Sequence, residues 1–327
     1  MCIKGGEKWV AERSKRIILY DPNKAKDINP ETLKLFQKYQ IDMSIRDLSE
    51  NSIKQYNTDL MQWFIYMHDN QFNLSVLEAT DEDLEEYYYW RKQQGNNVNR
   101  LKRIMSSISA FYKFLRKKKL IKESPVEFIE RPKQGQPITV QTYLTMDEVK
   151  LMREKLIEYG DLQLLVYAFM SLTTMARVNA IAHLRWEQID LDERVCENVL
   201  EKEGKIVELS FSEEVKDYLI QLKKYREDNN INDCGWLFYT PFVTEKKCIL
   251  SGTLNEWCKK IGAMIGHPTL HAHDFRHSFA TLLKNEAGLS LEDVSMLLNH
   301  SGVDVTRKFY IKEDTSKVIK LKDNFVI

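Results

Sequence analysis

The chain has 327 residues, 43% of them hydrophobic, and this length predicts about two domains, each with its own core. Lysine and arginine together number 48, as do aspartate and glutamate, so the net charge gives no overall sign of a polyanionic partner. The sequence contains no apolar run of about 18 residues and no apolar secretory segment at residues 1–7, which predicts a cytoplasmic protein without a membrane partner.

Residues 1–42 mix charged and apolar side chains without a clear period, and Pro22 and Pro30 interrupt them. We expect an N-terminal extension of uncertain role there. The first predicted helix covers residues 51–68, where apolar residues recur at helical spacing behind Ser49, a suitable N-cap.

Two further long helices and one short helix complete a predicted helical domain over residues 43–130. One long helix runs from Thr80 to about Gln94, the other covers residues 97–118, and the short one lies near 125–129. Taken alone, this pattern indicates a helical bundle with a charged exterior.

The stretch from Arg91 to Lys122 contains eleven lysine or arginine residues and no acidic residue. Such a local excess attracts polyphosphate even on a neutral protein, because salt confines each field to about 8–10 Å. The candidate phosphate contacts are Arg91, Lys92, Arg100, Lys102, Arg103, Lys113, Arg116, Lys117 and Lys118.

Residues 131–143 are predicted to form a linker, since their first part is rich in proline and glutamine. Helix restarts after Thr145, with Glu148 at the capping-box position, and opens a second domain over residues 144–327. Within it, residues 195–209 have the pattern of two short strands about a Glu-Gly turn. The predicted fold class is therefore mainly α with a small β-sheet or hairpin in the second domain.

The five cysteines are odd in number, scattered and without a C-x-x-C pair, which argues against disulfides and against a zinc site. No G-x-x-x-x-G-K-[S/T] loop for nucleotide phosphates is present. We expect reduced thiols, no metal and no cofactor.

The last part of the chain carries an ordered set of phosphate-binding and proton-handling side chains. The run H-A-H-D-F-R-H at residues 271–277 places His273 and Arg276 one helical turn apart. L-L-N-H then ends at His300, and K-F-Y ends at Tyr310. Each residue alone would be unremarkable on a solvated helix face, but their order and spacing predict phosphoryl transfer to a tyrosine.

These segments resemble the H-x-x-R, L-G-H and C-terminal tyrosine boxes of the tyrosine recombinases, the phage-integrase and Xer-type family. Upstream, T-M-A-R ending at Arg177 and the following L-R-W-E-Q-I-D are similar to the family's T-G-x-R and L-x-W-x-D-I. The hairpin sequence E-K-E-G-K resembles T-K-x-G-K, which matches Lys202 to the family's lysine and leaves Lys205 as the alternative.

The resemblance, which covers most of residues 140–310, implies a helical SAM-like core-binding domain and a catalytic domain that together form a C-shaped clamp on DNA. The basic residues named above would then contact DNA. It also implies a role for each motif residue: Arg177 and Arg276 on the phosphate, His273 as general base, Lys202 as general acid, His300 as hydrogen-bond donor and Tyr310 as nucleophile.

The chain departs from the family pattern at three positions. Met175 stands where the family usually has glycine, and Ala180 stands where an acid commonly follows the first arginine. We therefore expect Arg177 to be held differently here. Asn299 replaces the glycine of L-G-H, which fits a left-handed backbone, because asparagine tolerates that conformation better than most residues.

Residues 311–327 carry an apolar stripe, and the resemblance implies that this tail links four protomers into a homotetramer on DNA. It further implies double-stranded DNA with short inverted-repeat core sites as partner, an accessory directionality factor, and association with the nucleoid. The expected role is integrase or excisionase of a phage or mobile element. The alternatives are a Xer-like chromosome-dimer resolvase, a type IB topoisomerase, and a DNA-binding factor that has lost catalysis.

Overall fold

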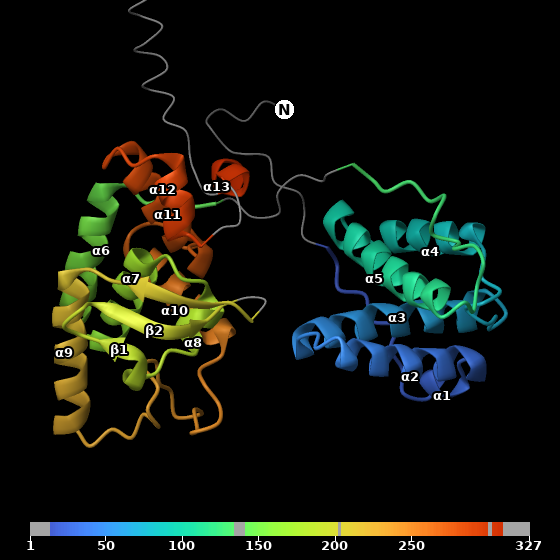
Figure 1. The fold of residues 1–327 in the computed structure, drawn as a ribbon, viewed down its shortest axis with the longest axis horizontal. Helices are drawn as coiled ribbons and strands as arrows, with labels where there is room; N and C mark the ends of the chain where they lie inside the picture. Colours follow the sequence, from blue (N-terminus) through green and yellow to red (C-terminus); the bar gives the residue numbers. More distant parts are fainter. Residues whose placement is uncertain (1–13, 134–140, 202–203, 300–302, 310–327) are drawn as a thin grey trace, which may run out of the picture. The chain divides into compact units, whose positions relative to one another are not determined.

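The computed structural model describes residues 14–133, 141–201, 204–299 and 303–309 and divides into two compact units, Met1–Val140 and Gln141–Ile327. Both units are mainly helical, and the second also holds a small sheet (Figure 1). This agrees with the predicted fold class. No helix in the described part of the chain combines the length and apolar character needed to cross a membrane.

The first unit contains five helices in its described residues, and polar side chains cap the four longer ones. Asn29, Ser49, Thr80 and Asn97 each accept a hydrogen bond from a backbone N–H of the first turn, which satisfies donors that a helix start leaves unpaired. The helices are α1 (Lys24–Asp27), α2 (Pro30–Ile45), α3 (Glu50–Asn70), α4 (Asp81–Gln93) and α5 (Val98–Lys117).

Aromatic side chains of α3 and α5 form the centre of this unit's core. The ring centroids of Trp63 and Tyr112 lie 5.7 Å apart, and those of Phe64 and Phe111 lie 5.8 Å apart. Such pairs contribute about 0.5–1.5 kcal/mol each beyond the burial of their area. The buried Tyr112 hydroxyl donates a hydrogen bond to the carbonyl of Val76 at 2.9 Å, so this hydroxyl has a partner inside the core.

The N-terminal boundary predicted between residues 42 and 43 is wrong, because it falls inside α2. Leu35, Phe36, Tyr39 and Met43 of this helix are buried in the same core as α3 and α5. Pro30 does not interrupt structure here: it occupies the first helical position, where a missing N–H and a fixed φ suit a helix start.

The short helix predicted near residues 125–129 is also absent, since turns and bends occupy this described stretch. Val126 and Ile129 nevertheless pack against the core, so the apolar spacing reflects anchoring of a loop.

The second unit contains a three-stranded antiparallel sheet of order β1-β2-β3. The predicted hairpin is β2 (Val195–Leu200) and β3 (Ile206–Ser210), and β1 (Ile189–Asp190) adds a short edge strand. The remaining elements are α6 (Met146–Tyr159), α7 (Leu162–Thr174), α8 (Val178–Ala182), the 3-10 helix η1 (Trp186–Gln188), α9 (Glu213–Asp228), α10 (Ser251–Met264), α11 (Ala272–Asn285), α12 (Leu291–Leu297) and α13 (Val303–Phe309).

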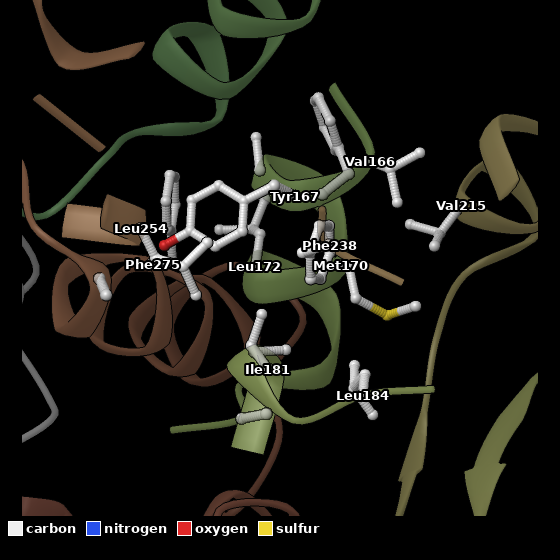
Figure 2. Packing of buried hydrophobic residues seen from close by; sticks show 14 of the residues in the cluster. Val166, Tyr167, Met170, Leu172, Ile181, Leu184, Val215, Phe238, Leu254 and Phe275 are labelled. Carbon is white, nitrogen blue, oxygen red and sulfur yellow. The ribbon is translucent and has the colours of Figure 1, made fainter. Parts of the chain in front are cut away.

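Helix α7 is the centre of the second unit. Ten of its thirteen residues are buried, and Figure 2 shows its side chains meeting residues from the surrounding elements. The residues labelled there are Val166, Tyr167, Met170 and Leu172 of α7 and, from the rest of the same core cluster, Ile181, Leu184, Val215, Phe238, Leu254 and Phe275. A helix that is apolar all round is fixed by its surroundings, so the end of α7 is a rigid support for the residues that follow it.

Four cysteines, Cys196, Cys234, Cys248 and Cys258, are free thiols, and Cys2 lies outside the described residues. Across the described ranges, no group of three or more histidine, cysteine, aspartate or glutamate side chains has a metal-binding arrangement.

Candidate active site

The first arginine box begins where α7 ends. Met175 is the C-cap of α7 in a left-handed conformation, with φ of 51°, and Arg177 is the N-cap of α8 two residues later. A residue other than glycine costs about 1–2 kcal/mol in this conformation. The buried Met175 side chain packs against Ala280, Val294 and Leu298, and this packing offsets part of that cost.

The second arginine box is fixed by the start of α11. Asp274 is fully buried and accepts hydrogen bonds from the backbone N–H of His271 at 3.0 Å and of Thr142 at 3.1 Å. One turn later, the Ser278 hydroxyl accepts from the backbone N–H of Leu144 at 2.8 Å. The helix that carries His273 and Arg276 is therefore tied to residues 142–144, which precede α6.

Arg276 connects three of the sequence boxes. Its side chain is 1% exposed and donates to the carbonyl of Met175 and, at 2.5 Å, to that of Leu298. Leu298 directly precedes Asn299, whose φ of 52° confirms the expected left-handed conformation. The two left-handed corners thus present backbone carbonyls to one buried guanidinium, which satisfies hydrogen-bonding groups that would otherwise be costly to bury.

A buried carboxylate that sequence reasoning missed joins the two arginines. Glu201 directly follows β2, and its side chain is only 2% exposed. Its Oε2 pairs with Nη1 of Arg177, and its Oε1 lies 4.0 Å from Nη1 of Arg276. Two features of the sequence could have indicated this role. Glu201 lies next to the predicted hairpin lysine, and the chain has Ala180 at the position where the family usually has an acid.

Part of the His273 side chain reaches solvent, and the surrounding protein lowers its affinity for a proton. Desolvation lowers the pKa of His273, and the positive charges of Arg276 and Arg177, with His271, lower it further, while Asp274 opposes them. A neutral imidazole able to accept a proton is therefore favoured at neutral pH.

The structure brings Arg177, His273 and Arg276 together, but three predicted site residues, Lys202, His300 and Tyr310, lie outside the described residues. The alternative lysine, Lys205, is described and exposed. Its carbonyl accepts a hydrogen bond from the backbone N–H of Glu201 at 2.8 Å, which closes the hairpin beside the two arginines.

Comparison with known proteins agrees with this geometry. The family model described as "Phage integrase family" matches residues 142–317, more than half of the chain, and "Phage integrase, N-terminal SAM-like domain" matches residues 36–119. The chain belongs to the phage integrase family of tyrosine recombinases. Members of this family are DNA strand-transferring enzymes, and the chain is one of them.

Curated relatives match this family member over most of their length. Tyrosine recombinase XerC of Rickettsia typhi is 26% identical over 296 residues, which is 85% of this chain and 91% of the relative. Tyrosine recombinase XerD of Oceanobacillus iheyensis is 28% identical over 286 residues, 81% of this chain and 88% of the relative.

Solved structures share the tyrosine recombinase fold. XerH site-specific recombinase, bound to a palindromic difH substrate, has a TM-score of 0.66 at 17% identity. The match covers 92% of this chain and 88% of the XerH chain. The Tn1549 transposon integrase, in complex with circular intermediate DNA, has a TM-score of 0.65 at 17% identity. The match covers 88% of this chain and 98% of the integrase chain.

One predicted DNA contact in this recombinase is wrong. Arg91 is 1% exposed, and its guanidinium donates to Asn96 at 2.8 Å and to Gln62 at 2.6 Å. A side chain enclosed in this way stabilises the first unit and cannot reach a DNA phosphate. Arg100 and Arg103 pair with the buried carboxylate of Asp59 at 2.5 and 3.7 Å.

The other candidates differ in how much of the side chain reaches solvent. Arg116 pairs with Glu127 at 3.2 Å. Arg100 and Lys102 are half-buried, whereas Lys92, Arg103, Lys113, Arg116, Lys117 and Lys118 are exposed.

Arg91→Ala is expected to lower the free energy of unfolding, because it leaves the buried polar groups of Gln62 and Asn96 without a donor, at about 1–3 kcal/mol for each. Urea unfolding measures this loss. The matched control is Lys113→Ala on the exposed side of α5, which should change stability by less than about 0.5 kcal/mol. An Arg91→Ala protein with unchanged stability and weakened DNA binding would show that this assignment is mistaken.

Proposed function

We propose that this tyrosine recombinase is site-specific and cleaves and rejoins DNA through a 3′-phosphotyrosine intermediate and a Holliday junction. The observation that carries the proposal is the meeting of Arg177 and Arg276 at one carboxylate, with His273 close enough for both guanidiniums to lower its pKa. Two fixed cations beside a neutral base suit an anionic phosphodiester that gains charge on its oxygens during attack.

The arginines in this proposal bind the scissile phosphate. A guanidinium donates paired hydrogen bonds to phosphate oxygens, a geometry that an ammonium cannot reproduce. Arg177 supplies the more accessible guanidinium, since its side chain is 28% exposed, and the enclosed Arg276, besides acting on the phosphate, also holds the surrounding backbone in place.

Tyr310 is the proposed nucleophile. Its phenol has an ordinary pKa of about 10, so at neutral pH a base must take the proton. His273 takes it, the phenolic oxygen forms a bond to phosphorus, and the bond from phosphorus to the 5′-oxygen breaks. Lys202, or Lys205 in its place, gives a proton to the departing 5′-oxygen, and His300 donates a hydrogen bond to the phosphate.

Rejoining reverses these steps with the 5′-hydroxyl of a second strand. One phosphodiester replaces another, so the exchange conserves bond energy and calls for no nucleotide cofactor. The proposed partner is double-stranded DNA with short inverted-repeat core sites. A homotetramer linked through residues 311–327, assisted by a directionality factor, belongs to the same proposal.

The biological role that we propose is integration or excision of a phage or mobile element. The fold shared with the transposon integrase supports this role. A second candidate, resolution of chromosome dimers, is favoured by the XerC and XerD relatives, which match more than four fifths of the chain.

Strand exchange between two different labelled duplexes tests the proposed function. A recombinase joins a strand of one duplex to the other at a defined sequence. Relaxation of supercoiled DNA without any exchange would instead support the type IB topoisomerase, and DNA binding without either reaction would support a factor that has lost catalysis.

The rate of adduct formation at subsaturating DNA is expected to fall only below the ordinary histidine pKa of about 6.5, since this rate reports groups of the free enzyme. The reason is that His273 serves as base when neutral, and its lowered pKa keeps it neutral to lower pH. His273→Gln should remove this acidic limb, whereas His183→Gln, at an exposed histidine of the same unit, should keep it. An unchanged pH profile in His273→Gln would exclude His273 as the base.

A further inference from the structure

We propose that Glu201 is a positioning residue, which orients the Arg177 guanidinium toward the scissile phosphate and offsets the repulsion between the two arginines. The inference rests on the proposed function and adds a seventh residue to its site. It follows from the placement of this carboxylate, because nothing in α8 could do the same: its residues, Val178 to Ala182, include no acid.

The Glu201 carboxylate is held firmly by its own backbone. Its N–H donates to the carbonyl of Lys205 at 2.8 Å, so the residue belongs to the stem of the hairpin. The side chain then extends inward, 2% exposed, to both arginines. In the sequence, Lys202, the proposed general acid, directly follows Glu201.

The burial of this carboxylate has an electrostatic reason. A buried carboxylate without a partner is unfavourable, and two neighbouring guanidiniums repel each other. Placing the carboxylate between the two cations removes both costs. Removing one partner of such an arrangement leaves the other charge without compensation.

The two arginines depend on Glu201 to different degrees. Arg276 also donates to the carbonyls of Met175 and Leu298, so its position is fixed without the carboxylate. For the Arg177 guanidinium, Glu201 is the hydrogen-bond partner in the described part of the chain. Loss of the Glu201 charge should therefore free Arg177 first, and a cation that must reorganise during the reaction stabilises the transition state less well.

The test compares Glu201→Gln with Glu201→Asp and with Glu197→Gln, which removes an exposed carboxylate from β2, the strand that directly precedes Glu201. Adduct formation on sheared host DNA is followed at saturating DNA, together with the DNA dissociation constant and the urea midpoint. We expect Glu201→Gln to slow adduct formation by about 10- to 100-fold, less than removal of a transition-state donor itself. Glu201→Asp should fall between Glu201→Gln and the wild type, and Glu197→Gln should match the wild type.

A double-mutant cycle separates positioning from a merely structural role. If Glu201 acts through Arg177, adding Glu201→Gln to Arg177→Ala should slow the reaction by less than about threefold further, because interacting residues are not additive. The inference would be overturned if the rate losses of the two single variants multiplied in the double variant. It would also be overturned if the Glu201→Gln protein were as fast as the wild type. Wild-type protein that forms no adduct at all would instead contradict the proposed function.

Discussion

Tyr310→Phe is expected to abolish the covalent adduct between protein and DNA while DNA affinity stays within about twofold of the wild type. The substitution removes the phenolic oxygen, so no bond to phosphorus can form, and it leaves a ring of nearly the same size. Tyr310 directly follows α13, and the preceding helix should be unaffected. Denaturing electrophoresis of labelled DNA measures the adduct, and filter binding measures the affinity.

The matched control is Tyr225→Phe, at an exposed tyrosine of α9 in the same unit, which should form the adduct at the wild-type rate. An adduct that persists in Tyr310→Phe would show that another residue is the nucleophile. Equal DNA binding by both variants and the wild type, with no adduct in any of them, would support the DNA-binding factor.

Arg276→Ala is expected to slow adduct formation by about 10²–10³-fold, as loss of a transition-state donor does in other enzymes. It should also lower the free energy of unfolding, since the buried carbonyls of Met175 and Leu298 each lose a donor, at about 1–3 kcal/mol per group. Arg276→Lys should recover little of either loss, because one ammonium group cannot reproduce the fork of the guanidinium.

Arg226 provides a control for the structural part of this effect. It is likewise buried in the second unit and donates to the carbonyls of Trp236 at 3.2 Å and Leu237 at 2.8 Å. Arg226→Ala should destabilise the protein to a similar extent but leave the adduct rate of the folded fraction unchanged. If both variants lose activity only in proportion to unfolding, Arg276 has no direct part in the reaction.

Local signals in the sequence predicted the helix starts well. The N-caps Ser49 and Thr145, and the capping box formed with Glu148, are confirmed, because such contacts form within one turn and depend little on the rest of the fold. Pro30 is ambiguous in the sequence because proline both interrupts helices and favours their first position, and only the buried face of α2 distinguishes the two.

Tertiary placement explains the two corrections that concern charge. Arg91 belongs to a basic run whose composition predicts a phosphate-binding surface, but composition does not report which face of α4 is buried. Glu201 was missed for the opposite reason: its partners lie 24 and 75 residues away in sequence, and nothing local indicates that its carboxylate turns inward.

The family's glycine positions illustrate how a sequence departure can preserve geometry. Met175 and Asn299 both adopt the left-handed conformation that glycine would allow without strain. The carbonyls on which Arg276 depends are therefore in place although neither glycine is present. For Asn299 the residue type predicted this conformation, whereas for Met175 only the surrounding packing reveals how it is held.

The most direct test of the central claim is to sequence the DNA that stays covalently attached to the protein after denaturation, with the wild type and Tyr310→Phe incubated in parallel with sheared host and element DNA. We predict adducts at one short inverted-repeat site with the wild type and none with the variant. Adducts scattered without sequence preference would contradict site-specific recombination by this protein.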